Sequence, residues 1–191
     1  MKLRTLALAA LFVLPTGFAF SDGVVQKLMT PADKARLEKY GETRKAALAE
    51  ARNGDAPKVA ELDALLAKPL LSTPDFDLGG EWRCRTIKAG GLSPLIVYGW
   101  FRCKVSDDGS GWKLEKASGS QRTTGRFYDD GEQRMIYLGS FHIAGETPKP
   151  YGGGPESDQI GYVFRTGEAE WRIELPAPQY ESKLDILEFR R

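Results

Sequence analysis

From Gly80 onward the sequence is a succession of short stretches in which apolar and polar residues alternate, and turn-forming residues separate them. Alternation with a period of two is typical of β-strands that bury one face. Asp-Asp-Gly occurs at 107–109 and again at 129–131, and this tripeptide favours a tight turn between two strands. The strands that we expect are Gly80–Lys88, Leu95–Val105, Gly111–Ala117, Gln121–Tyr128, Gln133–Ile143, Gln159–Thr166, Ala169–Leu175 and Leu184–Arg190.

About eight short strands joined mostly by tight turns are typical of an antiparallel up-and-down β-barrel or of a β-sandwich. A barrel leaves no exposed edge strand, because its first and last strands pair with each other. We therefore expect residues 80–191 to form a mainly β domain, a small antiparallel up-and-down barrel.

Residues 1–21 have the layout of a secretory signal peptide. Basic residues precede the apolar run Leu6–Leu14, and small residues follow it. Cleavage after Ala19 and cleavage after Ser21 both fit the pattern. The apolar run is shorter than the ~20 residues that a membrane-spanning helix needs, so we expect this segment to be removed. The prediction is a periplasmic or secreted protein that does not span the membrane.

Cys84 and Cys103 are the only cysteines in the chain. They fall in the first two expected strands, on the faces that also carry Trp82 and Phe101, so we expect them to be neighbours on the core side. An even number of cysteines in an exported chain indicates a disulfide. A bridge over this separation would stabilise the fold by about 3 kcal/mol. The alternatives are a reactive thiol pair and a metal site, and the absence of C-x-x-C spacing disfavours both.

Residues 22–79 are expected to form a helical hairpin followed by a linker. Thr30-Pro31 is typical of a helix start, and Asn53-Gly54-Asp55 ends one helix and begins the next. The narrow apolar stripe of this hairpin is expected to pack on the barrel, and binding of a partner is the alternative. Tyr98 and Trp100 point away from the cysteine face, and we expect them to contact the hairpin.

Composition and motifs argue against several classes of function. The chain has 27 basic and 26 acidic residues, and a nucleic-acid binder usually carries a basic excess. His142 is the only histidine, which disfavours His-rich metal sites. No G-x-S-x-G, H-E-x-x-H or Walker A pattern is present. We therefore expect no nucleic-acid partner, no catalytic motif, no metal and no cofactor.

Two features are candidates for ligand binding. Basic residues alternate outward along the expected strands and would form a positive stripe for an anionic partner such as a phosphate, a lipid headgroup or a glycan. The stripe consists of Arg83, Arg85, Arg102, Lys104, Arg122 and Arg126. The connection Ala144–Asp158 is too long for a tight hairpin and is a candidate lid or binding loop that contains Lys149 and Tyr151. The alternatives are a solvated barrel face and an ordinary surface loop.

Gly80-Glu81-Trp82 begins the first expected strand, and Arg190 lies at the end of the last. This arrangement is similar to the G-x-W pattern of the lipocalin and avidin (calycin) families. The resemblance implies an up-and-down barrel in which a basic residue of the last strand packs over the indole of Trp82. It therefore implies structural roles for Gly80, Trp82 and Arg190.

Longer blocks carry a second resemblance. They are GGEWRCRTIKAGGLSPLIVYGWFRCKV, SGSQRTTGRFYDDGEQRMIYLG, PYGGGPESDQIGYVFR and ESKLDILEF. From about Gly79 to Phe189 these blocks resemble a family of exported bacterial proteins of unknown function, domain-of-unknown-function family 4893. The resemblance implies that residues 80–191 form one unit, and it implies no activity.

These observations predict a noncatalytic periplasmic binding module for a small apolar or anionic ligand. A rival interpretation is a protein-interaction or inhibitor module of the periplasm that uses the hairpin or the barrel surface. An enzyme whose site carries no sequence motif is a third. The expected partner is thus a small molecule or a periplasmic protein, and the sequence leaves the oligomeric state open.

Overall fold

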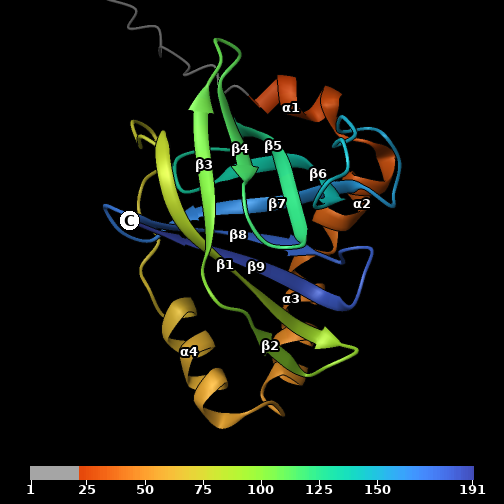
Figure 1. Cartoon of the computed structure of the whole chain (residues 1–191), viewed down its shortest axis with the longest axis vertical. Coiled ribbons are helices and arrows are strands. Elements are labelled where there is room, and N and C mark those ends of the chain that lie inside the picture. Colours follow the sequence, from red (N-terminus) through yellow and green to blue (C-terminus); the bar gives the residue numbers. More distant parts are fainter. Residues whose placement is uncertain (1–21) are drawn as a thin grey trace, which may run out of the picture.

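A computed structural model describes residues 22–191, in which a helical segment precedes an antiparallel β-barrel (Figure 1). The predicted signal peptide, residues 1–21, lies outside the described residues. The strands are β1 (Gly80–Gly91), β2 (Leu95–Val97), β3 (Phe101–Asp107), β4 (Trp112–Lys116), β5 (Gln121–Asp129), β6 (Met135–Ile143), β7 (Asp158–Arg165), β8 (Glu170–Pro176) and β9 (Ser182–Arg190). From β3 to β9 each strand pairs with the next, and β1 pairs with both β3 and β9. Within the described residues these eight strands close a barrel, which confirms the predicted fold class.

A β-bulge divides the second expected strand into β2 and β3. From Cys84 to Ile87, β1 advances three residues, whereas their partners on the other chain segment, Phe101 and Val97, are four residues apart. One extra residue on one strand bends it and increases its twist. The second half of β1 can therefore pair with β2 at one edge and with β9 at the other. The bulge also carries Trp100.

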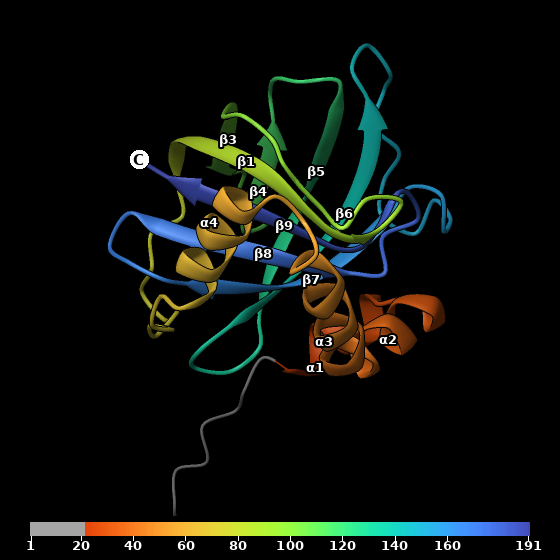
Figure 2. The same cartoon turned by 90° about the horizontal axis from the view of Figure 1, so that it is seen from below.

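The residues before the barrel form four helices in the described part of the chain: α1 (Asp22–Leu28), α2 (Pro31–Glu38), α3 (Tyr40–Ala51) and α4 (Ala56–Leu66). As predicted, Thr30 caps α2, and its hydroxyl accepts a hydrogen bond of 3.2 Å from the backbone N–H of Asp33. The first expected helix is interrupted at Lys39, where a turn separates α2 from α3. Helices α3 and α4 contact β1, β2 and β9, whereas α1 and α2 contact β5 and β7 (Figure 2).

Two apolar clusters attach the helices to the outer face of the barrel. Below α3 and α4, the buried residues are Ala47, Ala51, Leu62, Leu65, Ile87, Ala89, Leu95, Leu184 and Ile186. Below α1 and α2, they are Val25, Met29, Leu37, Ile136, Leu138 and Ile160. The strands under the helices are therefore apolar on both faces, whereas β3 and β4 alternate as a half-exposed sheet does.

The main core fills the inside of the barrel near the start of β1. Trp171 stacks on Phe189 with 3.6 Å between the ring centroids, and Trp82 meets Trp171 edge-on at 5.6 Å. Cys84 and Cys103 are buried in the same cluster and form a disulfide between β1 and β3, as predicted. This end of the barrel is packed with side chains.

Tyr137 forms the boundary between this core and the other end of the barrel. Its ring is fully buried, and its hydroxyl lies 2.6 Å from the hydroxyl of Thr123. Gly125 and Gly139 lie opposite each other on β5 and β6, and a Cβ atom on Gly139 would come within 2.2 Å of the Tyr137 hydroxyl. The two glycines thus leave the space that the tyrosine occupies.

Candidate functional site

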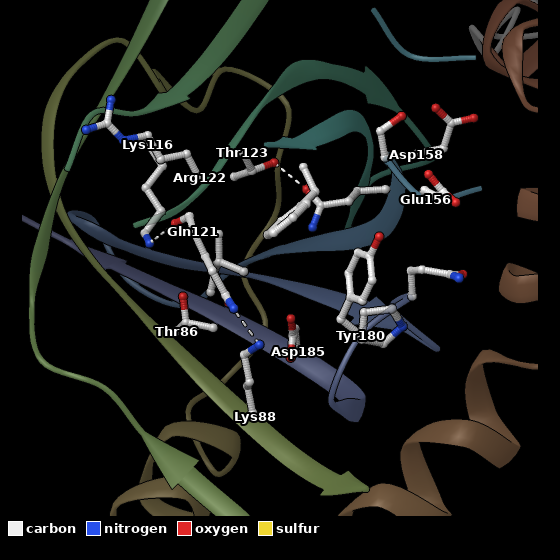
Figure 3. A pocket seen from close by; sticks show the side chains of 16 residues that line it. Thr86, Lys88, Lys116, Gln121, Arg122, Thr123, Glu156, Asp158, Tyr180 and Asp185 are labelled. Carbon is white, nitrogen blue, oxygen red and sulfur yellow. Dashed lines mark hydrogen bonds between the residues drawn. The ribbon is translucent and has the colours of Figure 1, made fainter. Parts of the chain in front are cut away.

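The inward-facing positions change from apolar to polar towards one end of the barrel. On β1, Trp82 faces the core, whereas Lys88 faces a pocket further along the same side. On β4 and β9 the inward positions of this end are Lys116 and Asp185. In the pocket they line, the space that a water-sized sphere can occupy is about 50 Å³, and the volume is about 540 Å³ when open solvent at the mouth is included (Figure 3). The barrel therefore has a filled apolar end and a polar end that opens to solvent.

Two lysines point into this pocket from opposite sides, with Gln121 between them (Figure 3). Lys88 and Lys116 are only 4% and 6% exposed. The Lys88 ammonium donates a hydrogen bond of 3.0 Å to Oε1 of Gln121, and it forms a salt bridge with Glu181. The Lys116 ammonium donates a hydrogen bond of 2.6 Å to the backbone carbonyl of Gln121.

The positive charge of Lys116 is only weakly balanced by nearby negative charge. In the part of the chain that the structure describes, Lys116 forms no salt bridge, and its ammonium lies 4.2 Å from the centroid of the Phe101 ring. Burial, together with the positive charges of Arg122 and Lys88, lowers the pKa of Lys116 to about 8. Because an ammonium in such a site lacks a counterion, an anionic group in the pocket would be attracted to it.

Asp185 is one of two buried carboxylates that line the pocket; the other, Asp158, accepts hydrogen bonds from the backbone N–H groups of Gly152 and Gly154. Asp185 lies opposite Lys88 in the β1–β9 register and accepts a hydrogen bond from the hydroxyl of Ser182. Burial raises the pKa of Asp185 to about 6, although the charge of Lys88 opposes this shift. The pocket lining thus carries three basic side chains, those of Lys88, Lys116 and Arg122, and three acidic ones, those of Glu156, Asp158 and Asp185. Glu181 adds a half-exposed carboxylate beside Lys88.

Aromatic and uncharged polar side chains complete the pocket. Thr123 donates a hydrogen bond to the side-chain oxygen of Gln159. At the mouth, Phe141 and Tyr180 pack with 5.6 Å between their ring centroids, and Tyr180 is 46% exposed. An entering molecule would meet aromatic surface first and polar groups deeper in the barrel.

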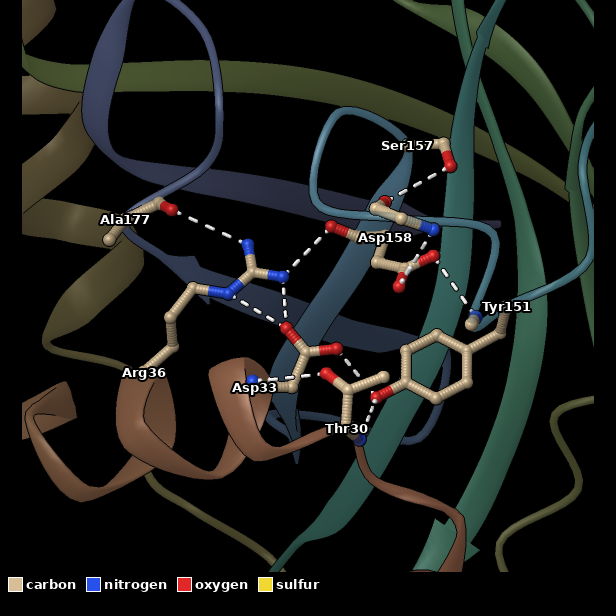
Figure 4. Close-up of polar contacts among 9 residues, drawn as sticks. Thr30, Asp33, Arg36, Tyr151, Ser157, Asp158 and Ala177 are labelled. Atoms are coloured by element: carbon tan, nitrogen blue, oxygen red, sulfur yellow. Dashed lines mark hydrogen bonds and ion pairs between the residues drawn. The ribbon is translucent and has the colours of Figure 1, made fainter.

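Helix α2 holds the two loops that form the mouth (Figure 4). Arg36 donates hydrogen bonds to the backbone carbonyl of Asp158, at 2.9 Å, and to that of Ala177, at 3.4 Å. Arg36 also pairs with the buried carboxylate of Asp33, which accepts a hydrogen bond from the hydroxyl of Tyr151. One helix therefore positions both the loop before β7 and the loop between β8 and β9.

The predicted binding residues Arg83, Arg85 and Arg102 lie together, but on the outside of the barrel. Arg83 and Arg102 are directly opposite each other on β1 and β3. Arg85 forms salt bridges with Glu188, at 2.6 Å, and with Glu61 of α4, at 2.7 Å. None of the three arginines lines the pocket.

The other two predicted binding residues, Lys149 and Tyr151, also lie away from the pocket. Tyr151 has a structural contact, because its hydroxyl joins the long loop to Asp33 and accepts a hydrogen bond of 3.1 Å from the backbone N–H of Thr30. Lys149 is exposed. The long connection reaches the pocket through its final residues, Glu156, Ser157 and Asp158.

The residues of the G-x-W pattern lie at the closed end of the barrel. Gly80 has a φ of 110°, a left-handed conformation that favours glycine, where the chain enters β1. Arg191 lies over the indole of Trp82, with 3.9 Å from its guanidinium carbon to the ring centroid. The expected Arg190 lies over Trp100 instead, at 3.8 Å. The indole of Trp100 is thus covered by arginine side chains.

Arg122 of the predicted positive stripe lines the pocket, whereas sequence reasoning missed Lys88, Lys116 and Asp185. Lys88 is in phase with Trp82 on β1, Lys116 with Leu114 on β4, and Asp185 with Phe189 on β9. A charged residue in phase with core residues is the signal that would have found them, because inward and outward positions alternate strictly along a barrel strand.

Two further searches of the described residues bear on the chemistry. No group of three or more His, Cys, Asp and Glu side chains in residues 22–191 is arranged to hold a metal ion. No helix in this range has the length and apolar character needed to cross a membrane. What the pocket offers chemically is two ammonium groups and one guanidinium, three carboxylates, hydrogen-bonding amides and hydroxyls, and an aromatic mouth.

Comparison with known proteins gave one match. The chain matches the family described as Domain of unknown function (DUF4893) over residues 25–189. No curated protein and no solved structure matches it.

Proposed function

Since the chain belongs to the family Domain of unknown function (DUF4893), whose description assigns no activity, we propose a function from the pocket itself. The protein is a noncatalytic binding module that takes a small organic anion into the polar end of its barrel. The observation that carries this proposal is the buried ammonium of Lys116, which faces the pocket without a salt-bridge partner among residues 22–191.

The charges of the pocket favour an anion over an apolar ligand. The apolar half of the barrel is filled by Trp82, Trp171 and Phe189, whereas the space left open is lined by three basic and three acidic side chains. Among these, the ammonium of Lys116 is buried and forms no salt bridge within residues 22–191. A carboxylate between the ammonium groups of Lys88 and Lys116 would form charge-assisted hydrogen bonds in a site that is partly shielded from water. An apolar ligand would instead bury the Lys116 ammonium without a counterion, which is unfavourable.

The mouth indicates what the rest of the ligand is. Phe141 and Tyr180 present aromatic surface where the ligand's body would lie once its anionic group has reached Lys116. Aromatic side chains of this kind stack on planar rings. The best-fitting small probe is therefore an aromatic carboxylate such as benzoate.

The direct test is a calorimetric or NMR titration with benzoate, and with its neutral analogue benzamide. We expect benzoate to bind and benzamide not to bind. Lys116→Met should weaken benzoate binding about 10-fold or more, because a charge-assisted hydrogen bond is lost. The matched control is Lys113→Met, which removes a lysine three positions away on the same strand that does not line the pocket.

Asp185→Asn tests the same site in the opposite direction. Removing this buried carboxylate leaves the pocket more positive, so benzoate should bind several-fold more tightly. Equal binding of benzoate and benzamide, or unchanged binding by Lys116→Met, would show that the pocket is not an anion site.

We also propose that the protein is exported to the periplasm. The Cys84–Cys103 disulfide supports an oxidising compartment, and the pattern of residues 1–21 supports a cleaved signal peptide. Intact-mass spectrometry of protein from a periplasmic extract should give a chain that begins after Ala19 or Ser21, with two hydrogens fewer than the reduced form. A full-length chain found in the cytoplasmic fraction would contradict export.

A further inference from the structure

Three arginines form a row across the outer face of the barrel. Arg83 on β1 lies directly opposite Arg102 on β3, and on its other side it lies directly opposite Arg190 on β9. The three strands are neighbours in the sheet and run side by side in Figure 1. Arg83 and Arg102 are exposed, and Arg190 is half-buried. We call Arg83, Arg102 and Arg190 the arginine row.

This arrangement is unfavourable for the folded protein by itself. Like charges that lie directly opposite each other on paired strands repel, and the arginine row contains two such pairs in succession. Within residues 22–191, no member of the row forms a salt bridge, whereas Arg85 next to it forms two.

Of the three carboxylates beside the row in the sheet, two bind other basic residues, and the third, Glu81, forms no salt bridge with the row within residues 22–191. Glu170 lies opposite Arg190 but binds Lys68 at 2.8 Å. Glu188 binds Arg85 at 2.6 Å. Glu81 lies opposite Lys104 in the β1–β3 register. The positive charge of the row is therefore not balanced by the chain around it.

Trp100 supports the guanidinium groups from below. The guanidinium carbons of Arg83 and Arg190 lie 5.2 Å and 3.8 Å from the centroid of its ring, and that of Arg85 lies at 4.8 Å. A guanidinium that stacks on an indole keeps its N–H groups free at its edge. Trp100 lies two residues before Arg102, so the alternation of side chains along the strand places both on this outer face.

We propose that the arginine row is a binding surface for phosphate groups, separate from the pocket inside the barrel. Planar guanidinium forks match phosphate oxygens in pairs, and one tetrahedral phosphate can accept hydrogen bonds from two neighbouring arginines. The outer two strands of the row are about 10 Å apart, which is enough for two phosphate groups beside each other. The ligand is a diphosphate or a set of adjacent phosphates on a lipid surface.

The experiment uses a probe for each source of phosphate. Pyrophosphate in a calorimetric titration represents a free ligand, and vesicles of phosphatidylglycerol and phosphatidylcholine represent a membrane, with vesicles of phosphatidylcholine alone as their control. All titrations are done with the full mature chain at 150 mM salt, and are repeated with Lys116→Met so that the pocket does not contribute. We expect at least one of the two phosphate probes to bind, and the one that binds identifies the source.

Matched substitutions test whether the row itself is responsible. Arg83→Gln removes the central charge and should reduce binding at least 10-fold, while its melting temperature is equal to or above that of the wild type because two repulsive pairs are removed. The matched control is Lys104→Gln, which removes one positive charge from the same outer face, two residues along β3 from Arg102. It should reduce binding less than 3-fold.

Three results would overturn the proposal. The first is absence of binding of both pyrophosphate and phosphatidylglycerol vesicles by the wild type at millimolar phosphate. The second is wild-type affinity in Arg83→Gln. The third is an equal loss in Lys104→Gln, which would indicate a general charge effect instead of a site. None of these results depends on whether benzoate binds in the pocket.

Discussion

Lys116 illustrates a residue whose charge reduces the stability of the fold that contains it. It is buried beside Lys88, and burial lowers its pKa to about 8 from the ordinary lysine value of 10.5. Below pH 8 the lysine is protonated in both the folded and the unfolded chain, and the folded chain bears the cost of burying the charge. Residues of this kind are retained where function requires them.

Lys116→Met should therefore raise the free energy of unfolding at pH 7 by about 1–2 kcal/mol. This value is smaller than the full pKa shift would give, because solvent reaches the ammonium through the mouth of the pocket and screens its charge. Between pH 8 and pH 10.5 the unfolded chain holds a proton that the folded chain has released, so Lys116 makes wild-type stability rise with pH. The variant should lack this rise. Urea unfolding at pH 7, 8, 9 and 10 measures both effects, with Lys113→Met as the control. A variant less stable than wild type at pH 7 would contradict this account.

For individual residues, the sequence predicted the core better than it predicted the site. Cys84 and Cys103 could be paired from their phase alone, because a disulfide requires two cysteines on one face of neighbouring strands. Lys88 and Lys116 were not identified, because hydrophobic patterning treats any lysine as an outward residue. Their position inside the barrel depends on the closure of β1 against β9, which brings distant strands around one cavity.

The side chain of Glu174, on strand β8, joins helix α3 to the barrel. Its fully buried carboxylate receives hydrogen bonds of 2.7 Å each from Arg172, from Arg44 and from the hydroxyl of Tyr40. Burial alone would raise its pKa, but the charges of Arg172 and Arg44 dominate and hold the pKa below its usual range. The contact attaches α3 to β8.

Glu174→Gln should lower the free energy of unfolding by about 3 kcal/mol, because it leaves the buried Arg172 guanidinium without a counterion. Glu170→Gln is the matched control on the same strand, since Glu170 forms a half-exposed salt bridge with Lys68 and should cost less than about 1 kcal/mol. Chemical unfolding at pH 7 measures the difference. Equal losses in the two variants would mean that burial of the ion pair does not matter here.

The disulfide ties β1 to β3 at the filled end of the barrel. Cys84→Ala, Cys103→Ala and the double variant should each lose about 3 kcal/mol, or about 10 °C in melting temperature, because each one removes the same bond. Thermal melts under nonreducing conditions measure this, and wild type melted with a reductant should match the variants. Additive losses from the two single substitutions would contradict a shared bond.

At the scale of elements, turn signals and alternation predicted the strands, because both depend on residues close in sequence. The bulge at Trp100 was not predicted, since it exists only because β1 changes partners from β3 to β2 along its length. The break at Lys39 was also missed, because the sequence from Pro31 to Ala51 is rich in helix formers throughout. Packing of α2 and α3 on different strands determines that turn.

For the whole molecule, the main question is whether the helices are an appendage or part of the folding unit. The sequence separates residues 22–79 from residues 80–191 by composition alone. In the structure, strands β1, β6, β7 and β9 bury their outer faces under helices, and β8 buries the Arg172–Glu174 ion pair there. A barrel without helices would expose these residues to water, which is strongly unfavourable.

We therefore predict that helices and barrel unfold together in one transition. All four tryptophans lie in residues 80–191, so tryptophan fluorescence reports on the barrel, whereas the far-ultraviolet circular dichroism minimum reports mainly on the helices. The two midpoints in urea should coincide, as two-state unfolding requires. A fragment that begins at Lys68 should fail to give the native fluorescence spectrum. If the helical signal were lost first, with native fluorescence retained, the helices would instead be a separable segment, and Arg36 would be free to release the loops at the pocket mouth without unfolding the barrel.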